Sequence, residues 1–213
     1  MKDNPALHFQ VMQPRDVTYL DEKLLDADGN LRVLPASVYE DIPWEHLRLW
    51  THFRAIYGLP TIELVEYLKK LIGGRSAIEI GSGNGVLGRA LGIPRTDNFM
   101  QTWPDVKLLY TLQGQPTITY GSDVEEMDAI EAIRKYKPEV VVASWVTQFS
   151  DGSRPGSMYG PDEEVLLSMV RSYMMFGSIK NHDHKVICNG IHQIIREPWM
   201  WSRAQDSALF IWG

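Results

Sequence analysis

Apolar positions recur along the chain with two periods, and together they predict an α/β protein. The stretch 61–72 repeats apolar residues every three or four positions and ends at Gly73, which is typical of an amphipathic helix with a glycine C-cap. Short apolar runs at 77–80 and 140–145 are typical of buried strands. Further helices are predicted over 44–57, 86–91, 122–136 and 162–171, and further strands over 93–96, 115–120, 173–176 and 185–188. Strands that alternate with helices favour an open, mostly parallel sheet.

The two ends of the chain have patterns of their own. Prolines interrupt the aromatic-rich first part, so residues 1–58 are expected to form a helical and irregular N-terminal extension, or lid, packed on a core domain of residues 59–213. Residues 1–10 hold no apolar stretch, and no signal peptide is expected there. Two apolar segments, 199–203 and 208–212, predict a terminal antiparallel strand pair.

Composition narrows the class of protein. The 213 residues are 44% hydrophobic and 23% charged, which predicts a globular chain of one or two domains. No apolar run reaches the length of about 18 residues that a membrane span needs, so no membrane partner is expected. Twenty-one basic and 27 acidic residues give a net charge of −6, which disfavours nucleic acid as the main partner. The single cysteine, Cys188, excludes an intrachain disulfide, is expected to be a buried apolar residue, and fits a reducing, cytoplasmic compartment.

The strongest chemical signal is the segment Glu79-Ile80-Gly81-Ser82-Gly83-Asn84-Gly85, directly after a predicted buried strand. Glycines at this point let the backbone turn sharply and approach a ligand closely. The overlapping segment Gly83-Asn84-Gly85-Val86-Leu87-Gly88 also fits the dinucleotide fingerprint. The Glu79 carboxylate disfavours a pyrophosphate ligand, since it would repel phosphate, whereas a cationic ligand tolerates it. Three interpretations therefore remain, in this order of preference: a site for a positively charged cofactor, a dinucleotide site and a purely structural turn.

An acid two positions before three alternating glycines resembles motif I of the class I S-adenosylmethionine-dependent methyltransferases. The resemblance covers residues 77–91 closely and becomes looser up to about residue 145. It implies a Rossmann-like, mostly parallel sheet of seven strands whose last strand is antiparallel, and S-adenosylmethionine as the cofactor. It also implies that Glu79 and the backbone of Gly81, Ser82, Gly83, Asn84 and Gly85 hold the methionine end of that cofactor.

The same resemblance implies where the rest of the cofactor binds. An acid ending the second strand would hold the ribose, and Asp97 is the candidate, because one carboxylate can accept both hydroxyl protons. Asp123 with Val124 would contact the adenine at the end of the third strand, and Ser144 with Trp145 would form the floor beside the transferred methyl group. Each has an alternative interpretation: a loop residue for Asp97, a helix cap for Asp123 and a core residue for Trp145.

Candidates for the acceptor side are more dispersed. An aromatic lid over the cofactor, or an ordinary packed helix, would come from Trp44, His46, Trp50, His52 and Tyr57. The Gly/Ser/Pro-rich loop 148–161 and the region 98–115 could bind substrate through Gln148, Asp151, Arg154, Tyr159, Gln101, Trp103 and Tyr110. No catalytic base is predicted. His182-Asp183-His184 lacks a third ligand, so no metal site is expected.

These features predict an S-adenosylmethionine-dependent methyltransferase acting on a small-molecule or protein acceptor. The chain has neither an Asn/Asp-Pro-Pro-Tyr/Phe tetrapeptide nor a Pro-Cys pair, which disfavours a nucleic-acid methylase. Two alternatives from other classes stay open. One is a non-catalytic protein of the same fold that binds the cofactor or a partner, and the other is an NAD-type oxidoreductase.

Overall fold

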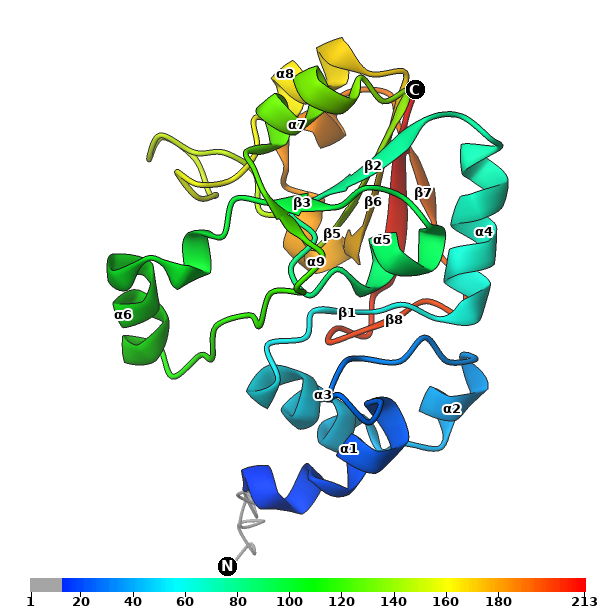
Figure 1. Ribbon diagram of the computed structural model, residues 1–213, viewed down its shortest axis with the longest axis vertical. Coiled ribbons are helices and arrows are strands. Elements are labelled where there is room, and N and C mark those ends of the chain that lie inside the picture. Colours follow the sequence, from blue (N-terminus) through cyan, green and yellow to red (C-terminus); the bar gives the residue numbers. More distant parts are fainter. Residues whose placement is uncertain (1–12) are drawn as a thin grey trace, which may run out of the picture.

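The computed structural model describes residues 13–213, which fold into a central sheet with helices on both faces (Figure 1). The expectation about a signal peptide concerns residues outside this range. The helices, including the short 3-10 turns η1 to η3, are η1 (Pro14–Val17), α1 (Tyr19–Leu24), α2 (Ser37–Glu40), α3 (Trp44–Phe53), α4 (Ile62–Ile72), α5 (Val86–Leu91), η2 (Met100–Thr102), α6 (Pro104–Leu112), α7 (Ala129–Tyr136), α8 (Glu163–Met169), α9 (Ile179–His182) and η3 (Val186–Asn189). The strands are β1 (Gly58–Leu59), β2 (Ala77–Ile80), β3 (Thr96–Asp97), β4 (Glu125–Glu126), β5 (Val140–Ser144), β6 (Ser172–Ser178), β7 (Gln193–Ile195), β8 (Trp201–Ser202) and β9 (Ser207–Trp212).

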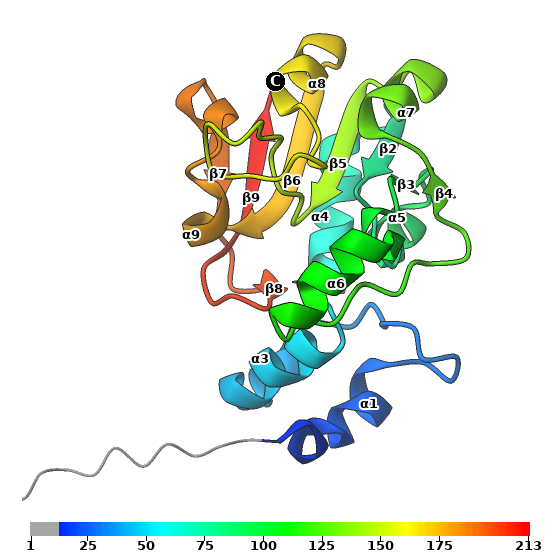
Figure 2. The same ribbon diagram turned by 90° about the vertical axis from the view of Figure 1, so that its left-hand side faces the viewer.

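The central sheet is mostly parallel, as the alternating pattern predicts. Strands β2, β5 and β6 run parallel, and β9 lies antiparallel between β6 and β7 (Figure 2). The short parallel pair β3–β4 continues the sheet beyond β2 through a bridge between Glu79 and Arg95, and the Glu79 amide donates to the Pro94 carbonyl at 2.8 Å. The resulting order is β4-β3-β2-β5-β6-β9-β7, so the carboxyl ends of β2, β3, β4, β5 and β6 lie at one edge.

Successive side chains of a strand point to opposite faces of the sheet, so apolar strands give it two apolar faces, and helices cover each of them. Val140 and Val142 of β5 pack against α4 and α5, whereas Val141 and Ala143 pack against α7 and α8. Hydrophobic burial on both faces explains why β5 reads as a continuous apolar run. Residues 14–57 add a further core around Tyr39, Leu47 and Trp50.

Local sequence signals set several helix ends as predicted. The Thr61 hydroxyl accepts a hydrogen bond from the Leu64 amide at 3.1 Å and begins α4, and Gly73 ends it with a φ of 61°. Gly92 ends α5 in the same left-handed conformation, with a φ of 73°. The strand predicted over 77–80 and the loop predicted over 148–161 are also confirmed.

Four predicted elements were wrong. Residues 115–120 are irregular, and the third parallel strand is β4 instead. The helix predicted over 122–136 begins only at Ala129, because the Asp128 carboxylate caps it by accepting from the Ile130 amide at 2.8 Å. Residues 185–188 form η3 rather than a strand. The predicted terminal pair does not form.

The two partners of that terminal pair are separated by pairing with distant segments. Strand β9 inserts between β6 and β7, and β8 pairs with β1, so that Gly58 lies opposite Ser202. Tyr39 stacks on Trp201 with ring centroids 5.7 Å apart. These contacts fasten residues 14–57 to the sheet, and Figure 1 shows α1 to α3 gathered at one end of it. The division into an extension (1–58) and a core domain (59–213) stays a prediction.

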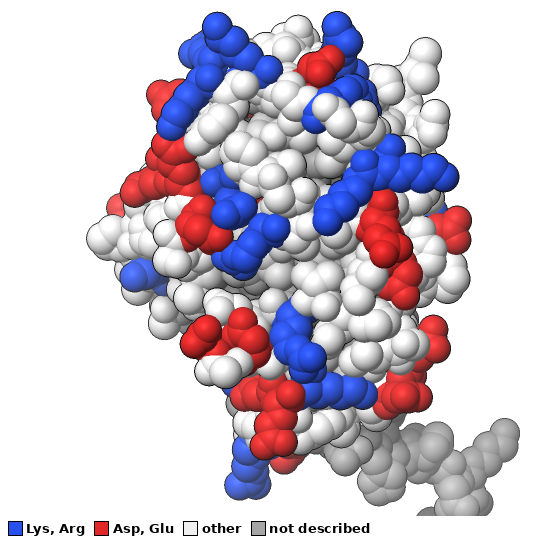
Figure 3. Space-filling model, turned by 45° about the vertical axis from the view of Figure 1, so that its right-hand side comes forward, with Lys and Arg blue, Asp and Glu red and all other residues white. Residues whose placement is uncertain are grey.

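The charges on the described surface and the lengths of the described helices agree with what the composition predicts. On the face drawn in Figure 3, lysines and arginines alternate with acidic residues, and the described residues of that face form no continuous basic stripe. No helix within residues 13–213 is long and apolar enough to cross a bilayer.

Candidate cofactor and acceptor site

The glycine segment forms the turn between β2 and α5, at the carboxyl edge of the sheet. Gly81 has a φ of 57°, and a β-carbon there would clash with a methyl carbon of Val146. Gly85 has a φ of 72°, and a β-carbon there would lie 2.7 Å from Val124. Both positions therefore need glycine for two reasons, the left-handed backbone and the close neighbour.

Glu79 is buried beneath this turn. Its carboxylate accepts a hydrogen bond from the Gly88 amide at 2.9 Å, and burial raises its pKa to about 8 in spite of that bond. A β-carbon on Gly88 would lie 2.5 Å from the same carboxylate oxygen. Gly88 therefore makes room for the Glu79 carboxyl group. This need for space accounts for the third glycine of the apparent dinucleotide fingerprint, so no bound nucleotide is required to explain it.

The amide groups of the turn are already engaged within the protein. The Gly83 amide donates to the Asp97 carboxylate at 2.9 Å, and the Gly85 amide donates to the Ser82 carbonyl at 2.8 Å. The Val86 amide donates to the Asn84 side chain at 3.1 Å. A pyrophosphate bound at a helix N-terminus needs such donors free. The engaged donors disfavour a dinucleotide.

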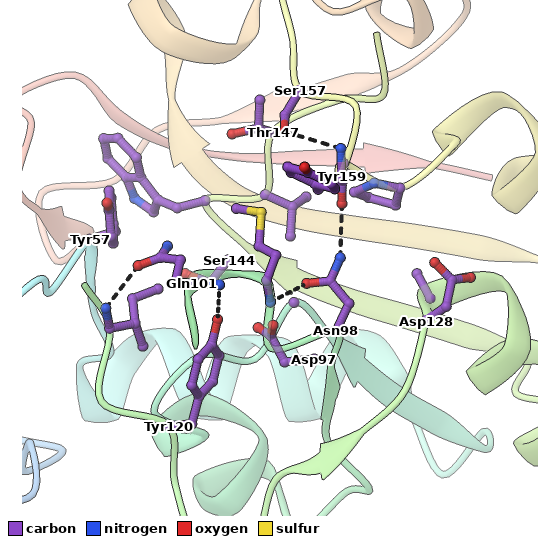
Figure 4. A pocket seen from close by; sticks show the side chains of 18 of the residues that line it. Tyr57, Asp97, Asn98, Gln101, Tyr120, Asp128, Ser144, Thr147, Ser157 and Tyr159 are labelled. Carbon is purple, nitrogen blue, oxygen red and sulfur yellow. Dashed lines mark hydrogen bonds between the residues drawn. The ribbon is translucent and has the colours of Figure 1, made fainter. Parts of the chain in front are cut away.

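Asp97 joins the end of β3 to the glycine turn. Its second carboxylate oxygen accepts from the Phe99 amide at 3.0 Å, and burial raises its pKa above the usual value. The carboxyl group lines a cavity of about 320 Å³ that opens at the carboxyl edge of the sheet (Figure 4). This volume lies within the range of small-molecule sites.

A second, smaller hollow of about 60 Å³ adjoins the first. Tyr57, Gly81, Ile118 and Ser144 line both. Eight of the eleven predicted cofactor residues line one hollow or the other: Glu79, Gly81, Ser82, Gly83, Asn84, Asp97, Ser144 and Trp145. The structure thus brings most of the predicted site together in one place. Gly85, Asp123 and Val124 line neither.

Asp123 lies outside the cavity because the strand on which its assignment rested does not exist. It precedes β4 and forms ion pairs with Arg89 and Arg95, at 2.5 and 2.8 Å, which hold its pKa at about 2. Val124 packs against Gly85. Strand β4 takes the place of the predicted third strand, and the acid that follows β4 is Asp128. Asp128 lines the cavity and also caps α7. The missed signal was an N-cap aspartate directly before an amphipathic helix.

Trp145 follows β5 in an unusual backbone conformation. Its φ is 59°, which is rare for a bulky residue, and its amide donates to the Phe176 carbonyl at 2.8 Å. The indole packs against Tyr57, with centroids 6.0 Å apart, and edge-on against His182 at 5.2 Å. Strain of this kind occurs mainly where the surrounding structure holds a functional side chain in place.

The loop 148–161 and the region 98–115 cover the cavity from one side. Asn98 donates to the Tyr159 carbonyl at 2.9 Å, and Trp103 packs edge-on against the Tyr159 ring at 5.0 Å. Gln101 and Tyr110 line the cavity, as does Tyr159. The other loop candidates point elsewhere: Gln148 is buried and bonds to the Pro155 carbonyl, Asp151 bonds to Ser153, and Arg154 pairs with Glu164.

Of the predicted aromatic lid, Tyr57 alone lines the cavity. Trp50 is buried in the N-terminal core and donates to Asp21 at 2.8 Å, and His46 bonds to the Tyr19 hydroxyl at 2.9 Å. The helix is therefore an ordinary packed one, and its final turn leads to the single residue that reaches the site.

The histidine pair His182 and His184 and the cysteine Cys188 are not among the described residues that line the cavity. His182 is buried, and its Nδ1 accepts from the Ser178 amide at 3.0 Å. Burial lowers the His182 pKa to about 4. Cys188 is half-buried, and burial raises its pKa to about 11. Within the described range, no three side chains of the metal-ligating types cluster as an ion would require.

Several solved structures are similar to this chain at low sequence identity, whereas no family model and no curated protein matches its sequence. A candidate methyltransferase complexed with SAH aligns with 70% of this chain and 48% of its own, at 8% identity and a TM-score of 0.38. Precorrin 8W decarboxylase of Methanobacterium thermoautotrophicum aligns over 75% and 94%, at 15% identity and a TM-score of 0.39. A SAM-dependent methyltransferase from Agrobacterium tumefaciens aligns over 71% and 61%, at 10% identity and a TM-score of 0.37. The chain spans about half the length of the first of these proteins.

Proposed function

We propose that this protein binds S-adenosylmethionine and transfers its methyl group to an acceptor in the adjoining cavity. One observation carries the proposal. The glycine turn after β2, Asp97 at the end of β3 and Ser144 at the end of β5 converge on two hollows that share lining residues at the carboxyl edge of the sheet. Ligands of open α/β sheets bind at this edge.

The order of the strands supports the same proposal. The resemblance of the glycine segment to motif I implies a sheet of seven strands, of which the last is antiparallel. Within residues 13–213, the five-stranded sheet and the pair β3–β4, which the Glu79–Arg95 bridge joins to β2, make seven strands. The last of them in the chain, β9, is antiparallel to both of its neighbours. This order was not used to recognise the motif, so it is independent support for a Rossmann-like methyltransferase sheet.

The charge of the lining suits a cation. The two hollows present the carboxyl groups of Glu79, Asp97 and Asp128, and their described lining residues include no lysine, arginine or histidine. S-adenosylmethionine carries a sulfonium and an ammonium group, which carboxylates attract. A dinucleotide pyrophosphate would meet engaged amides and the carboxyl groups of Asp97 and Asp128, with no cation among the lining residues. The lining therefore favours the sulfonium cofactor over the NAD-type alternative.

The residues present can hold each part of this cofactor. Glu79 and the turn from Gly81 to Asn84 would hold the methionine end, and Asp97 would hold the ribose. Met127 and Asp128, after β4, would hold the adenine in place of Asp123 and Val124. When bound, the cofactor supplies an electrophilic methyl group. Tyr57 and Trp145 would exclude water beside it, and positioning would provide much of the rate enhancement.

Calorimetric titration of the full chain with S-adenosylhomocysteine tests the proposal. We expect micromolar binding, equivalent to about 8 kcal/mol. Replacing Asp97 with asparagine is expected to weaken binding about tenfold, since a charged acceptor of hydrogen bonds is lost. The matched Asp123→Asn variant, which changes an acid outside the cavity, should bind within about twofold of wild type. Circular dichroism would check that both variants fold.

Two results would contradict the proposal. One is binding of NADH without binding of S-adenosylhomocysteine, which would support an oxidoreductase. The other is equal weakening by Asp97→Asn and Asp123→Asn, which would place the ligand outside this cavity. Binding of S-adenosylhomocysteine without methylation of any acceptor would instead support the non-catalytic binding protein.

A further inference from the structure

One end of the main cavity is lined by aromatic rings and amides and lies opposite Asp128. This acceptor end consists of Tyr57, Gln101, Tyr110, Gln115, Ser144 and Trp145. Figure 4 shows Tyr57 and Gln101 on one side of the cavity and Asp128 on the opposite side. Ser144 also lines the smaller hollow beside the glycine turn, so the acceptor end adjoins the proposed methionine subsite.

The acceptor end lacks the groups that would hold an anion. Its described residues are all uncharged, and the charged groups in the cavity lining are the carboxyl groups of Asp97 and Asp128. The Arg203 guanidinium lies over the Tyr57 ring, 4.8 Å from its centroid, and is not among the lining residues. A carboxylate, phosphate or thiolate acceptor entering this cavity would lose its hydration without meeting a cation among the lining residues. Anionic acceptors are therefore disfavoured.

The acceptor end also lacks a general base. Asp97 is turned to the amides of Gly83 and Phe99, and Asp128 to those of α7. Burial and the neighbouring Tyr57 raise the pKa of the Tyr110 hydroxyl to about 12, so it stays protonated. Alcohols, phenols and ammonium groups must lose a proton before they attack a methyl group. An aliphatic amine, with a pKa of about 10, is almost fully protonated at neutral pH.

A ring nitrogen of an uncharged heterocycle meets these conditions, because its lone pair is free at neutral pH without a base. Tyr57 and Trp145 pack on each other, with centroids 6.0 Å apart at an angle of 45°, and both line the cavity, so a planar ring can pack against the aromatic surface that they share. The Gln101 side chain is fixed, since its oxygen accepts from the Ile118 amide at 2.8 Å, which leaves its NH2 group as a donor. We infer that the acceptor is a small uncharged nitrogen heterocycle, methylated on a ring nitrogen, an inference that rests on the proposed methyltransferase function.

The reaction balances without a further reactant. The ring nitrogen's lone pair forms the new nitrogen–carbon bond while the carbon–sulfur bond breaks, and that electron pair stays on sulfur. The positive charge passes from sulfur to the ring, where the aromatic ring of Trp145 can stabilise it by cation–π attraction. If the ring carries an N–H elsewhere, its proton leaves to water.

The contacts across the cavity favour a free small molecule over a residue of a protein. The Asn98–Tyr159 hydrogen bond and the Trp103–Tyr159 ring contact join two segments that line the cavity. The cavity that these segments border, of about 320 Å³, has the size of a small-molecule site. A histidine ring in a peptide shares the heterocycle chemistry, so the test includes it as a separate arm.

The test uses the full chain with S-adenosylmethionine and the probes benzimidazole, quinoline and imidazole. Benzylamine, phenol and benzoate serve as controls of similar size, and a histidine-containing peptide is the protein arm. Mass spectrometry would detect the methylated product and S-adenosylhomocysteine. We expect N-methylation of at least one heterocycle, at a rate at least tenfold above that of every control and of the peptide.

A charge variant localises the reaction. Gln115→Lys places a cation at the acceptor end and is expected to lower heterocycle turnover at least tenfold, because it repels the positive charge that develops on the ring. Affinity for S-adenosylhomocysteine should stay within about twofold. Gln113→Lys makes the same charge change at an exposed position outside the cavity lining and should leave turnover unchanged.

The outcomes separate this inference from the proposed function. If S-adenosylhomocysteine does not bind, the proposed function fails and the inference fails with it. If it binds but no free heterocycle is methylated, or a control or the peptide is methylated faster, the inference alone is overturned. Equal effects of the two lysine variants would also overturn it, since the reaction would then not depend on the acceptor end.

Discussion

Replacing Lys185 with methionine is expected to lower the free energy of unfolding by about 3–5 kcal/mol, because it leaves a buried acid without its counter-charge. Lys185 is 2% exposed, and its ammonium donates to the Glu163 carboxylate at 2.7 Å. The Tyr173 hydroxyl donates to the same oxygen at 2.7 Å. Burial lowers the pKa of Lys185, and the charge of Glu163 opposes that change. Each member of the pair is thus costly to bury alone.

Urea unfolding at pH 7 would measure this effect, and two variants serve as controls. The double variant Lys185→Met with Glu163→Leu removes both charges and should recover most of the loss, because apolar pairs of similar volume often replace buried ion pairs without a penalty. Lys135→Met breaks the pair with Glu125, which is exposed, and should change stability little. A loss below about 1 kcal/mol for Lys185→Met would mean that the pair is hydrated in solution.

The stability of the wild-type protein is expected to fall with rising pH between about 4.5 and 8 relative to that of Glu79→Gln. The folded protein holds the Glu79 pKa at about 8, whereas the ordinary value is 4.5, because burial disfavours the charged carboxylate. Between these values the folded state binds more protons than the unfolded state. The stabilising effect is complete below pH 4.5 and is lost as the pH rises towards 8, by about 1.4 kcal/mol per pH unit.

Unfolding free energies at pH 5, 6.5 and 8 would reveal this slope as the difference between wild type and Glu79→Gln. Glutamine is the matched substitution, since its oxygen can still accept from the Gly88 amide. Saturating S-adenosylmethionine is expected to flatten the slope, because a cation beside Glu79 favours the ionised carboxylate. Parallel curves for the two proteins without ligand would show that Glu79 is ionised in the folded state near its ordinary pKa.

Much of the candidate site follows from residues close together in sequence. A buried strand followed by alternating glycines locates the turn, and the acid at Glu79 indicates its charge preference. For this reason the structure places eight of the eleven predicted residues around two hollows that share lining residues. Asp123 was misplaced because β3 and β4 have only two residues each, too few to produce a recognisable apolar pattern.

The sequence by itself determined the elements whose ends are fixed locally: α4 between Thr61 and Gly73, the strand β2 with its glycine turn, and the buried strand β5. Caps, glycine turns and continuous apolar runs depend on neighbours a few residues away, so the pattern contains them. Only the tertiary structure decided that β9 inserts between β6 and β7, and that β8 pairs with β1 to bring Tyr57 to the cavity. It also decided that Lys185 meets Glu163 in the interior and that Asp128 faces the site. Those outcomes depend on burial and pairing between segments far apart in the chain, and their free energies come from contacts that no local pattern records.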